Sequence, residues 1–390
     1  MQNQKLYEET ARKFKEHFGS EHTATAYAPG RVEVLGNHTD YNEGLVLSAA
    51  INMGIFCLVA PSPDNTCRIV AGDLMKEATF ELDDTSVDPD NMWANYIKGV
   101  FVKLRERLPE KIDSAFNLLF FSNVPLGAGL SSSAALEISS GLSFCALYDF
   151  TIPKLDMALI GQASEHDYAG VMCGVMDQIS SIFGKQNQLI KSDFRSLEVK
   201  NEPLGEDLCL LVCDTNAKHA LADGVYNKRR EKCEEAAKYF AGVLDHPVTA
   251  LRDVSMDEWK AHQPNMDPEA AKRSAHVIGE NERVTLGAKY LEEGDAEAFG
   301  KLMFESHESS IHNFENSCEE LDFIVEQARN IPGALGARLS GGGFGGSAVI
   351  LLHPRDIETV GQAIKTPYEK KFNLTCGLRA IIPSEGARII

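Results

Sequence analysis

The chain is poor in basic side chains. Its 390 residues carry 38 Lys and Arg against 57 Asp and Glu, a formal charge of −19 at pH 7. Nucleic acids and anionic membrane surfaces are bound through basic patches, which this balance can supply only locally. The composition therefore argues against both partners, and it predicts that an anionic small molecule would need a focused site.

Long hydrophobic runs and paired cysteines are also missing. The first 19 residues alternate charged and apolar side chains without the apolar core of a secretion signal. The longest apolar stretches, such as 348–352, are far too short to cross a membrane. The nine cysteines are odd in number and form no CxxC pair, so a zinc site is not indicated. We expect reduced, mostly buried thiols and a cytoplasmic location, and nothing in the sequence indicates an obligate protein partner.

The length and the apolar content of the chain are sufficient for more than one folded domain. With 44% hydrophobic residues, a chain of 390 residues can bury large cores, and such a length usually divides into two or three domains. A polar stretch at 199–207 is typical of a surface connection. We therefore predict an N-terminal lobe of residues 1–205 and a C-terminal lobe of residues 206–390.

A glycine and serine loop at 124–137 is a prominent local pattern. It follows the short apolar run 116–121, which is typical of a buried strand, and it precedes apolar residues at helical spacing from Ala135 to Cys145. The first turn of a helix presents unpaired N–H groups that attract anions, and glycines let a phosphate approach the backbone. The loop lacks the lysine of a Walker A motif and the third glycine of a dinucleotide fingerprint. Phosphate binding and simple helix capping by the serines are both open interpretations.

A dense polar loop spans residues 36–44, between two glycines. Asn37, His38 and Asp40 lie in it, and apolar residues follow. Polar loops between strands often carry binding residues, although an ordinary turn with self-bonded side chains also explains one such loop. The His-x-Asp pair could suggest a metal site, but no third ligand lies near it in the sequence.

A second glycine loop precedes Ser347 and the apolar run at 348–352. Five of its six consecutive residues are glycines: Gly341, Gly342, Gly343, Gly345 and Gly346. Each glycine costs backbone entropy on folding, so a close approach to a ligand or to another loop is the favoured explanation. A purely structural bulge is the alternative.

Two single residues stand out by their surroundings. Asp177 lies among Val175, Met176 and Ile179, where an unpaired charge would be costly. It therefore either has a partner or caps a helix. Trp93, near the start of a predicted helix, could wall a purine pocket, although a Trp at helical spacing is more often part of a core.

Taken in order, these motifs resemble those of the GHMP small-molecule kinases and, within that superfamily, the galactokinases. The stretch 28–44 is similar to the galactokinase signature, 125–135 to the ATP loop and 338–346 to the third motif. The resemblance covers nearly the whole chain, with shorter matches at 173–178, 226–230, 306–307 and 316–322. It implies an α+β fold of two lobes, an N-terminal lobe with the ATP loop and a ferredoxin-like C-terminal lobe, with the active site between them.

The resemblance also implies an activity and a set of roles. It implies transfer of a phosphoryl group from ATP, with Mg²⁺, to the anomeric C1 hydroxyl of a small-molecule sugar, galactose. Asp177 matches the catalytic aspartate and Arg31 the arginine beside it, while Ser133 and Glu165 match the magnesium ligands. The expected sugar contacts are Asn37, His38, Asp40, Gly174 and Tyr226. The expected ATP contacts are Gly127, Ala128, Gly129, Leu130, Ser131, Ser132, Ser133 and Trp93.

One departure from the family pattern bears on the sugar. Galactokinases normally carry glutamate, expected against the C6 side of the sugar, where this chain has Asn37. Asparagine still bonds a hydroxyl but is shorter and neutral, and the loss of a carboxylate would remove repulsion towards an anionic C6 group. Galactose is the expected substrate, with galacturonate, N-acetylgalactosamine and arabinose as alternatives. A non-catalytic galactose sensor is the alternative outside enzymes, and the presence of Arg31, Asp177 and the intact run 131–135 argues against it.

Overall fold

The first sheet belongs mostly to the N-terminal half of the chain. In the computed structural model, which describes residues 2–125, 127–218 and 222–390, this sheet has eight strands. Six run in the order β12-β1-β2-β5-β3-β4, while β6 pairs with β2 and β7 with β6. The pairing of β3 with β5 is parallel and the others are antiparallel. The strands are β1 (Ala24–Leu35), β2 (Leu45–Pro61), β3 (Thr66–Ala71), β4 (Lys76–Glu81), β5 (Phe116–Ser122), β6 (Gln188–Asp193), β7 (Val199–Pro203) and β12 (Arg388–Ile389).

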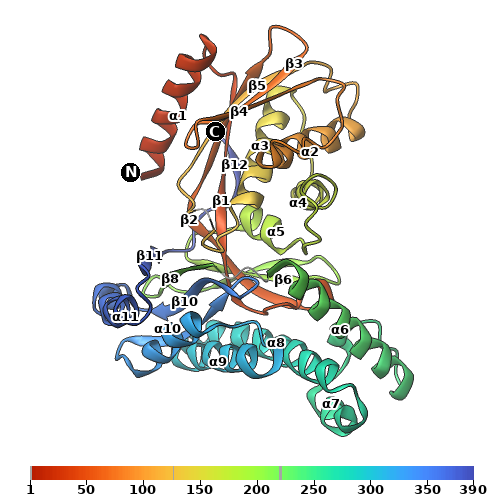
Figure 1. The fold of residues 1–390 in the computed structure, drawn as a ribbon, viewed down its shortest axis with the longest axis vertical. Coiled ribbons are helices and arrows are strands. Elements are labelled where there is room, and N and C mark those ends of the chain that lie inside the picture. Colours follow the sequence, from red (N-terminus) through yellow and green to blue (C-terminus); the bar gives the residue numbers. More distant parts are fainter. Residues whose placement is uncertain (1, 126, 219–221) are drawn as a thin grey trace.

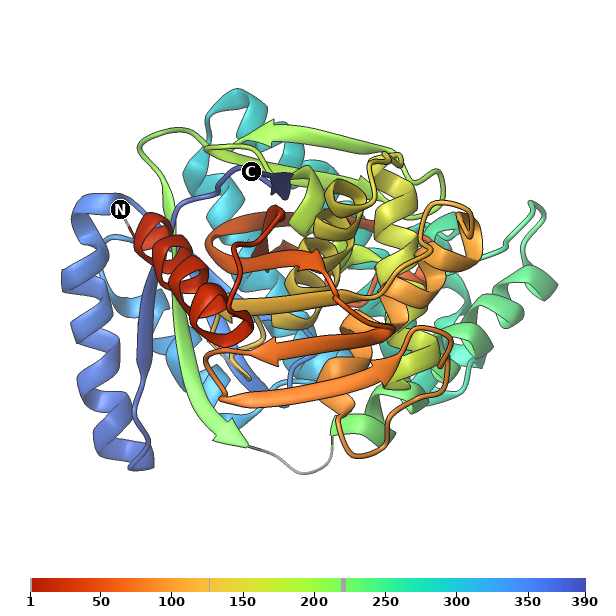
Figure 2. The same cartoon turned by 90° about the horizontal axis from the view of Figure 1, so that it is seen from above.

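Helices cover both faces of this sheet (Figures 1 and 2). Helix α1 packs on one face, where Phe14 joins apolar side chains of β1, β2 and β5 in one buried cluster. Helices α2 to α5 lie on the other face and enclose the largest apolar core. The helical segments are α1 (Gln2–Phe18), η1 (Asp40–Asn42), α2 (Met92–Arg107), α3 (Ser132–Leu147), α4 (Lys154–Ser164), the π-helical η2 (Glu165–Ala169) and α5 (Met176–Phe183).

The second sheet has four antiparallel strands in the order β11-β8-β10-β9. This is the strand order of a ferredoxin-like unit, so the predicted α+β fold with a ferredoxin-like C-terminal lobe is confirmed. Helices α10 and α11 pack on one face of the sheet. The strands are β8 (Cys209–Lys218), β9 (Ala334–Ser340), β10 (Gly345–Leu352) and β11 (Gly377–Ile381). The helical segments are α6 (Ala222–Val243), η3 (Leu251–Asp253), α7 (Met256–His262), η4 (Gln263–Asn265), α8 (Pro268–Glu293), α9 (Ala296–Ser309), the π-helical η5 (Ser310–Phe314), α10 (Glu319–Asn330), η6 (Pro354–Asp356) and α11 (Ile357–Phe372).

The two sheets share a core. Val32 of β1 and Leu47 of β2 belong to one buried cluster with Val349 of β10 and Phe299 of α9. The chain also returns to the first sheet at its end, where β12 pairs with β1. Residues 388–389 therefore lie with the first sheet, although the predicted boundaries assign them to the second lobe. The division between residues 205 and 206 stays a prediction.

The polar stretch 199–207 is only partly a connection. Its first five residues form β7, because β6 offers a strand edge with which they pair. Seven of the nine cysteines are buried, as predicted. Among the helices of the described residues, none combines the length and the apolar composition that a membrane crossing requires.

Candidate active site

A cavity of about 520 Å³ lies between the two lobes. Its walls come from segments far apart in the sequence: strand β1, the polar loop after it, residues 169–177 and the second glycine loop. The predicted site residues that line it are Arg31, Asn37, His38, Asp40, Gly174, Asp177, Gly341, Gly342 and Gly343. The fold thus brings the polar loop, the isolated aspartate and the second glycine loop to one cavity.

Arg31 and Asp177 form a two-point ion pair in the cavity wall. Arg31 Nε donates to Asp177 Oδ1 at 2.7 Å, and Arg31 Nη2 donates to Oδ2 at 2.9 Å. The arginine side chain is 7% exposed and the aspartate side chain 24% exposed, so the carboxylate remains accessible from the cavity. Asp177 stands in the first turn of α5, whose N-cap is Val175. The interpretation that Asp177 has a charged partner is therefore confirmed, and the alternative that it is the N-cap is wrong.

The first glycine loop is joined to this ion pair. Arg31 Nη1 donates to the carbonyl oxygen of Gly129 at 2.6 Å, and the Ser131 hydroxyl donates to Asp177 Oδ2. Gly127 and Gly129 have φ angles of +74° and +70°, which glycine adopts without strain. Ser131 is the N-cap residue of α3, but its side chain caps no backbone N–H. The capping interpretation is therefore wrong for Ser131, because its backbone is left-handed, with φ +50°, instead of extended as in a typical N-cap.

The magnesium ligands expected from the family lie together. Ser133 stands in the first turn of α3, and Glu165 begins η2. Burial raises the pKa of Glu165, while hydrogen bonds from Cys173, Ser133 and Gln178 act in the opposite direction. Hydroxyl and carboxylate oxygens are the donors that Mg²⁺ prefers, so this pair fits the ion. In the described ranges no group of three or more His, Cys, Asp and Glu side chains could hold a metal, which leaves the His-x-Asp pair without a third ligand.

His38 faces the cavity as a neutral ring. Its Nε2 lies 3.3 Å from the carbonyl oxygen of Gly342, and its Nδ1 lies 2.8 Å from the Tyr41 hydroxyl. A carbonyl only accepts, so Nε2 carries the proton and Nδ1 accepts from the hydroxyl. Burial lowers the pKa of His38 to about 3, and the ring also stacks on Phe314 at 4.3 Å between centroids.

The Asp40 carboxylate lies against the backbone of Gly174 in the cavity wall. A Cβ atom at Gly174 would stand 1.8 Å from Asp40 Oδ2, so only glycine allows this approach. Burial, together with the charges of Glu33 and Asp177, raises the pKa of Asp40 to about 7. Asp40 is therefore a carboxyl group whose charge changes near neutral pH.

The second glycine loop lies close to two other segments. A Cβ atom at Gly343 would stand 2.1 Å from the carbonyl oxygen of Asn316, which no larger residue could avoid. Carbonyl oxygens of this loop accept hydrogen bonds from Asn37 and His38. The register of β10 against β8 also shifts after Gly345. Both explanations for the glycines therefore apply: the loop closely approaches the segment at Asn316, and it contains a structural bulge.

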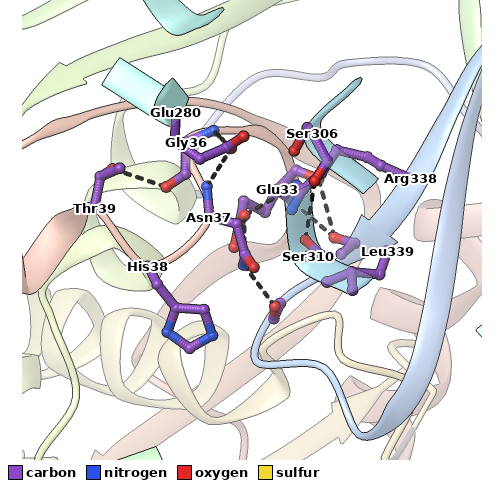
Figure 3. A network of polar contacts seen from close by, with 12 residues as sticks. Glu33, Gly36, Asn37, His38, Thr39, Glu280, Ser306, Ser310, Arg338 and Leu339 are labelled. Atoms are coloured by element: carbon purple, nitrogen blue, oxygen red, sulfur yellow. Dashed lines mark hydrogen bonds and ion pairs between the residues drawn. The ribbon is translucent and has the colours of Figure 1, made fainter. Parts of the chain in front are cut away.

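Asn37 is 1% exposed and belongs to a network that joins the two lobes (Figure 3). Its Nδ2 donates to Glu33 Oε1 at 2.9 Å and to the carbonyl oxygen of Gly341 at 2.8 Å. Its Oδ1 accepts from Asn316 Nδ2 at 3.0 Å. Glu33 Oε1 also accepts from Arg338 Nη1 at 3.0 Å. The amide of Asn37 is thus engaged mainly with protein groups, which its expected role as a sugar contact did not anticipate.

Glu280 of α8 holds the polar loop from the second lobe (Figure 3). Its Oε2 accepts the backbone N–H groups of Gly36 and Asn37 at 2.7 and 2.8 Å, and its Oε1 accepts from Arg283 Nε at 2.6 Å. Burial opposes its ionisation, but the charge of Arg283 and other nearby groups lowers the pKa of Glu280. Sequence reasoning missed this residue. The one available signal was an acidic residue on the buried face of its helix.

The expected ATP contacts and Tyr226 are not among the described residues that line the cavity. Trp93 packs against Phe120, with ring centroids 6.2 Å apart, at the edge of the largest core, as the alternative interpretation expected. Its contact with ATP stays a prediction, as do the ATP contacts of residues 127–133 in the first glycine loop. The side chain of Tyr226 lies outside the described residues.

Comparisons with protein families agree with the motifs. Residues 12–61 match a galactokinase galactose-binding signature, residues 95–185 match the N-terminal domain of GHMP kinases, and residues 288–370 match their C-terminal domain. The chain is 40% identical over 371 residues to a galactokinase of Haemophilus influenzae, with 94% of each chain covered. It is 39% identical over 382 residues to a galactokinase of Mannheimia succiniciproducens, which covers 96% of this chain and 97% of that one.

Solved structures show the same relation. The crystal structure of Lactococcus lactis galactokinase complexed with galactose has a TM-score of 0.92 and 30% identity, and the match covers 98% of this chain and 99% of that one. A mevalonate kinase structure has a TM-score of 0.66 at 16% identity, with 94% and 99% covered. At this low identity, the likeness to mevalonate kinase is one of fold alone.

Proposed function

The chain belongs to the galactokinase family, and we propose that it transfers the γ-phosphoryl group of ATP to the C1 hydroxyl of galactose, forming galactose 1-phosphate. The observation that carries this proposal is the Arg31–Asp177 pair, accessible from the cavity and bonded to the first glycine loop. Galactose is favoured over galacturonate, N-acetylgalactosamine and arabinose, because the relatives named above are galactokinases and one was solved with galactose.

Phosphoryl transfer depends mainly on positioning and on charge stabilisation. Asp177 orients the C1 hydroxyl and takes its proton as the hydroxyl oxygen attacks the γ-phosphorus and ADP leaves. Arg31 fixes both oxygens of that carboxylate and, through Gly129, ties it to the loop that would hold the phosphates. The first-turn N–H groups of α3 would face those phosphates. One arginine thus aligns the base with the ATP loop.

Ser133 and Glu165 would hold Mg²⁺. Held by these two side chains, Mg²⁺ would supply positive charge that stabilises the phosphate groups during transfer. Glu165 Oε2 accepts hydrogen bonds from Cys173 Sγ at 2.8 Å and from Gln178 Nε2 at 3.0 Å. These two side chains fix the orientation of the carboxylate towards Ser133.

We place this reaction in the cytoplasm. All nine cysteines are free thiols and seven of them are buried, which is typical of proteins kept in a reducing compartment. ATP and a small-molecule sugar are the proposed ligands, and no obligate protein partner is proposed.

The test is coupled ADP release by the purified protein with ATP, Mg²⁺ and a panel of galactose, galacturonate, N-acetylgalactosamine, arabinose and glucose. The highest kcat/KM is expected with galactose. A higher value with another galacto-configured sugar would keep the kinase and change its substrate. No turnover with any sugar, together with measurable galactose binding, would contradict the proposal and favour a sensor.

Galactose binding should weaken as the pH falls below about 7. Burial and two neighbouring charges raise the pKa of Asp40 to about 7, and a carboxylate accepts a sugar hydroxyl better than the neutral acid does. The charged form, and with it binding, should therefore be gained as the pH rises through 7. We expect KM for galactose to rise by up to about tenfold per pH unit below that value, as for a single ionisation.

The Asp40→Asn variant is the control for this pH dependence. It should have a higher KM at every pH, without the step near pH 7, because the amide does not ionise. KM values would be measured between about pH 5.5 and 8.5 in both proteins. A flat KM in the parent protein would contradict a role for Asp40 ionisation.

A further inference from the structure

Strand β1 carries two charged side chains into the cavity. Arg31 and Glu33 are two residues apart, so they point to the same side of the strand, and both line the cavity. Their register against β2 is regular, with Arg31 opposite Ala50 and Glu33 opposite Ser48. Two residues of strand span roughly 7 Å, about the breadth of a pyranose ring. Glu33 therefore lies about the breadth of one pyranose ring from the Arg31–Asp177 pair.

The donors of Asn37 are not available to a sugar at this end of the cavity. Its two amide hydrogens are donated to Glu33 and to the carbonyl oxygen of Gly341. An asparagine has only two such hydrogens. Its Oδ1 already accepts from Asn316, so Asn37 acts mainly as a bridge between protein groups.

Glu33, by contrast, has one carboxylate oxygen that can accept a hydrogen bond from a ligand. Its Oε1 accepts from Asn37 Nδ2 and from Arg338 Nη1, whereas no donor from the part of the chain that the structure describes reaches its Oε2. The Glu33 side chain is 3% exposed and the Arg338 side chain fully buried. A carboxylate so enclosed, with one oxygen unpartnered beside a polar cavity, is a site for a hydroxyl donor.

We propose that Glu33, rather than Asn37, supplies the carboxylate that accepts the C6 hydroxyl of the sugar and repels sugars with an anionic C6 group. Position 37 is where the family resemblance expects a carboxylate against the C6 side, and Glu33 Oε1 lies 2.9 Å from Asn37 Nδ2. The carboxylate is thus moved to the neighbouring strand residue and held there by Asn37 and Arg338. This inference rests on the proposed function, since it concerns the sugar of the same site.

The test compares the parent protein with Glu33→Gln. KM for galactose should rise by about tenfold or more with kcat within about threefold, because a charged acceptor is lost from binding and not from the reacting atoms. The ratio of kcat/KM for galacturonate to that for galactose should rise by at least about tenfold. KM for 6-deoxygalactose, which lacks the hydroxyl, should change by less than about threefold. Glu202→Gln is the matched control, because Glu202 is a buried glutamate of β7 paired with Lys200 outside the cavity.

A second variant covers the case in which Glu33→Gln does not fold. The double variant Glu33→Asn/Asn37→Glu exchanges the two side chains. It keeps the charge and returns the carboxylate to position 37, so the preference for galactose over galacturonate should be retained. An unchanged sugar ratio in folded Glu33→Gln, or a fall in kcat at constant KM, would overturn the inference. So would an exchange variant that accepts galacturonate as well as galactose.

Calorimetric galactose binding separates this inference from the proposed function. A parent protein that binds galactose without turnover would contradict the kinase, while a loss of affinity in Glu33→Gln would still support the contact. A parent protein with full turnover and a Glu33→Gln variant with unchanged affinity would contradict the contact alone.

Discussion

Replacing Asp177 by asparagine is expected to lower kcat for galactose by about 10²- to 10⁴-fold while galactose affinity changes by less than about threefold. The asparagine keeps the shape of the side chain, and Arg31 can still donate to its remaining oxygen. No group is then placed to take the proton of the C1 hydroxyl. The measurements are steady-state ADP release and calorimetric galactose binding on the same preparation.

Asp193→Asn is the matched control for that variant. Asp193 of β6 accepts from both terminal nitrogens of Arg252, and its side chain is 23% exposed against 24% for Asp177. The same charge is thus removed from the same kind of ion pair outside the cavity, and kcat should stay within about twofold. Near-parental turnover in the Asp177 variant would remove this residue from the mechanism.

Removing the Glu280 carboxylate should cause a large loss of stability. Glu280→Ala is expected to lower the free energy of unfolding by about 3–5 kcal/mol, because it leaves the Arg283 charge beside a buried gap and two backbone N–H groups without their acceptor. The loop that carries His38 and Asp40 also loses its anchor, so KM for galactose should rise. Denaturant unfolding and steady-state kinetics measure the two effects.

Glu202→Ala is the control variant, because it removes a buried glutamate away from the polar loop. Glu202 is 1% exposed, but its partner Lys200 has a side chain that is 65% exposed. The cation left behind is therefore solvated, and a loss of only about 1 kcal/mol is expected. Equal losses in the two variants would mean that Glu280 contributes no more than an ordinary buried carboxylate.

The motifs were predictable because each is a local pattern. A strand, a glycine loop and a helix form an anion-binding turn from chain neighbours alone, and an aspartate among apolar residues needs a partner wherever it folds. The capping alternative for Ser131 was likewise drawn from its position at the start of a helix. It is wrong because the backbone of Ser131 is left-handed instead of extended, as a typical N-cap would be, and its hydroxyl donates to Asp177. Neither Asp177 as the acceptor nor the left-handed backbone of Ser131 can be read from spacing.

By itself, the sequence determined the family and the class of reaction, and it predicted which residues surround the reacting atoms. The tertiary structure alone decided how the cavity wall around Asn37 is built. Glu33 meets Arg338 across 305 residues, Asn37 meets Asn316 across 279, and Glu280 binds the amide of Gly36 across 244. Such contacts depend on how the two lobes pack around their shared core, and no spacing along the chain encodes them. The sequence alone therefore indicates that a carboxylate has been lost at position 37, whereas in the folded chain the carboxylate of Glu33, from β1, lies beside Asn37.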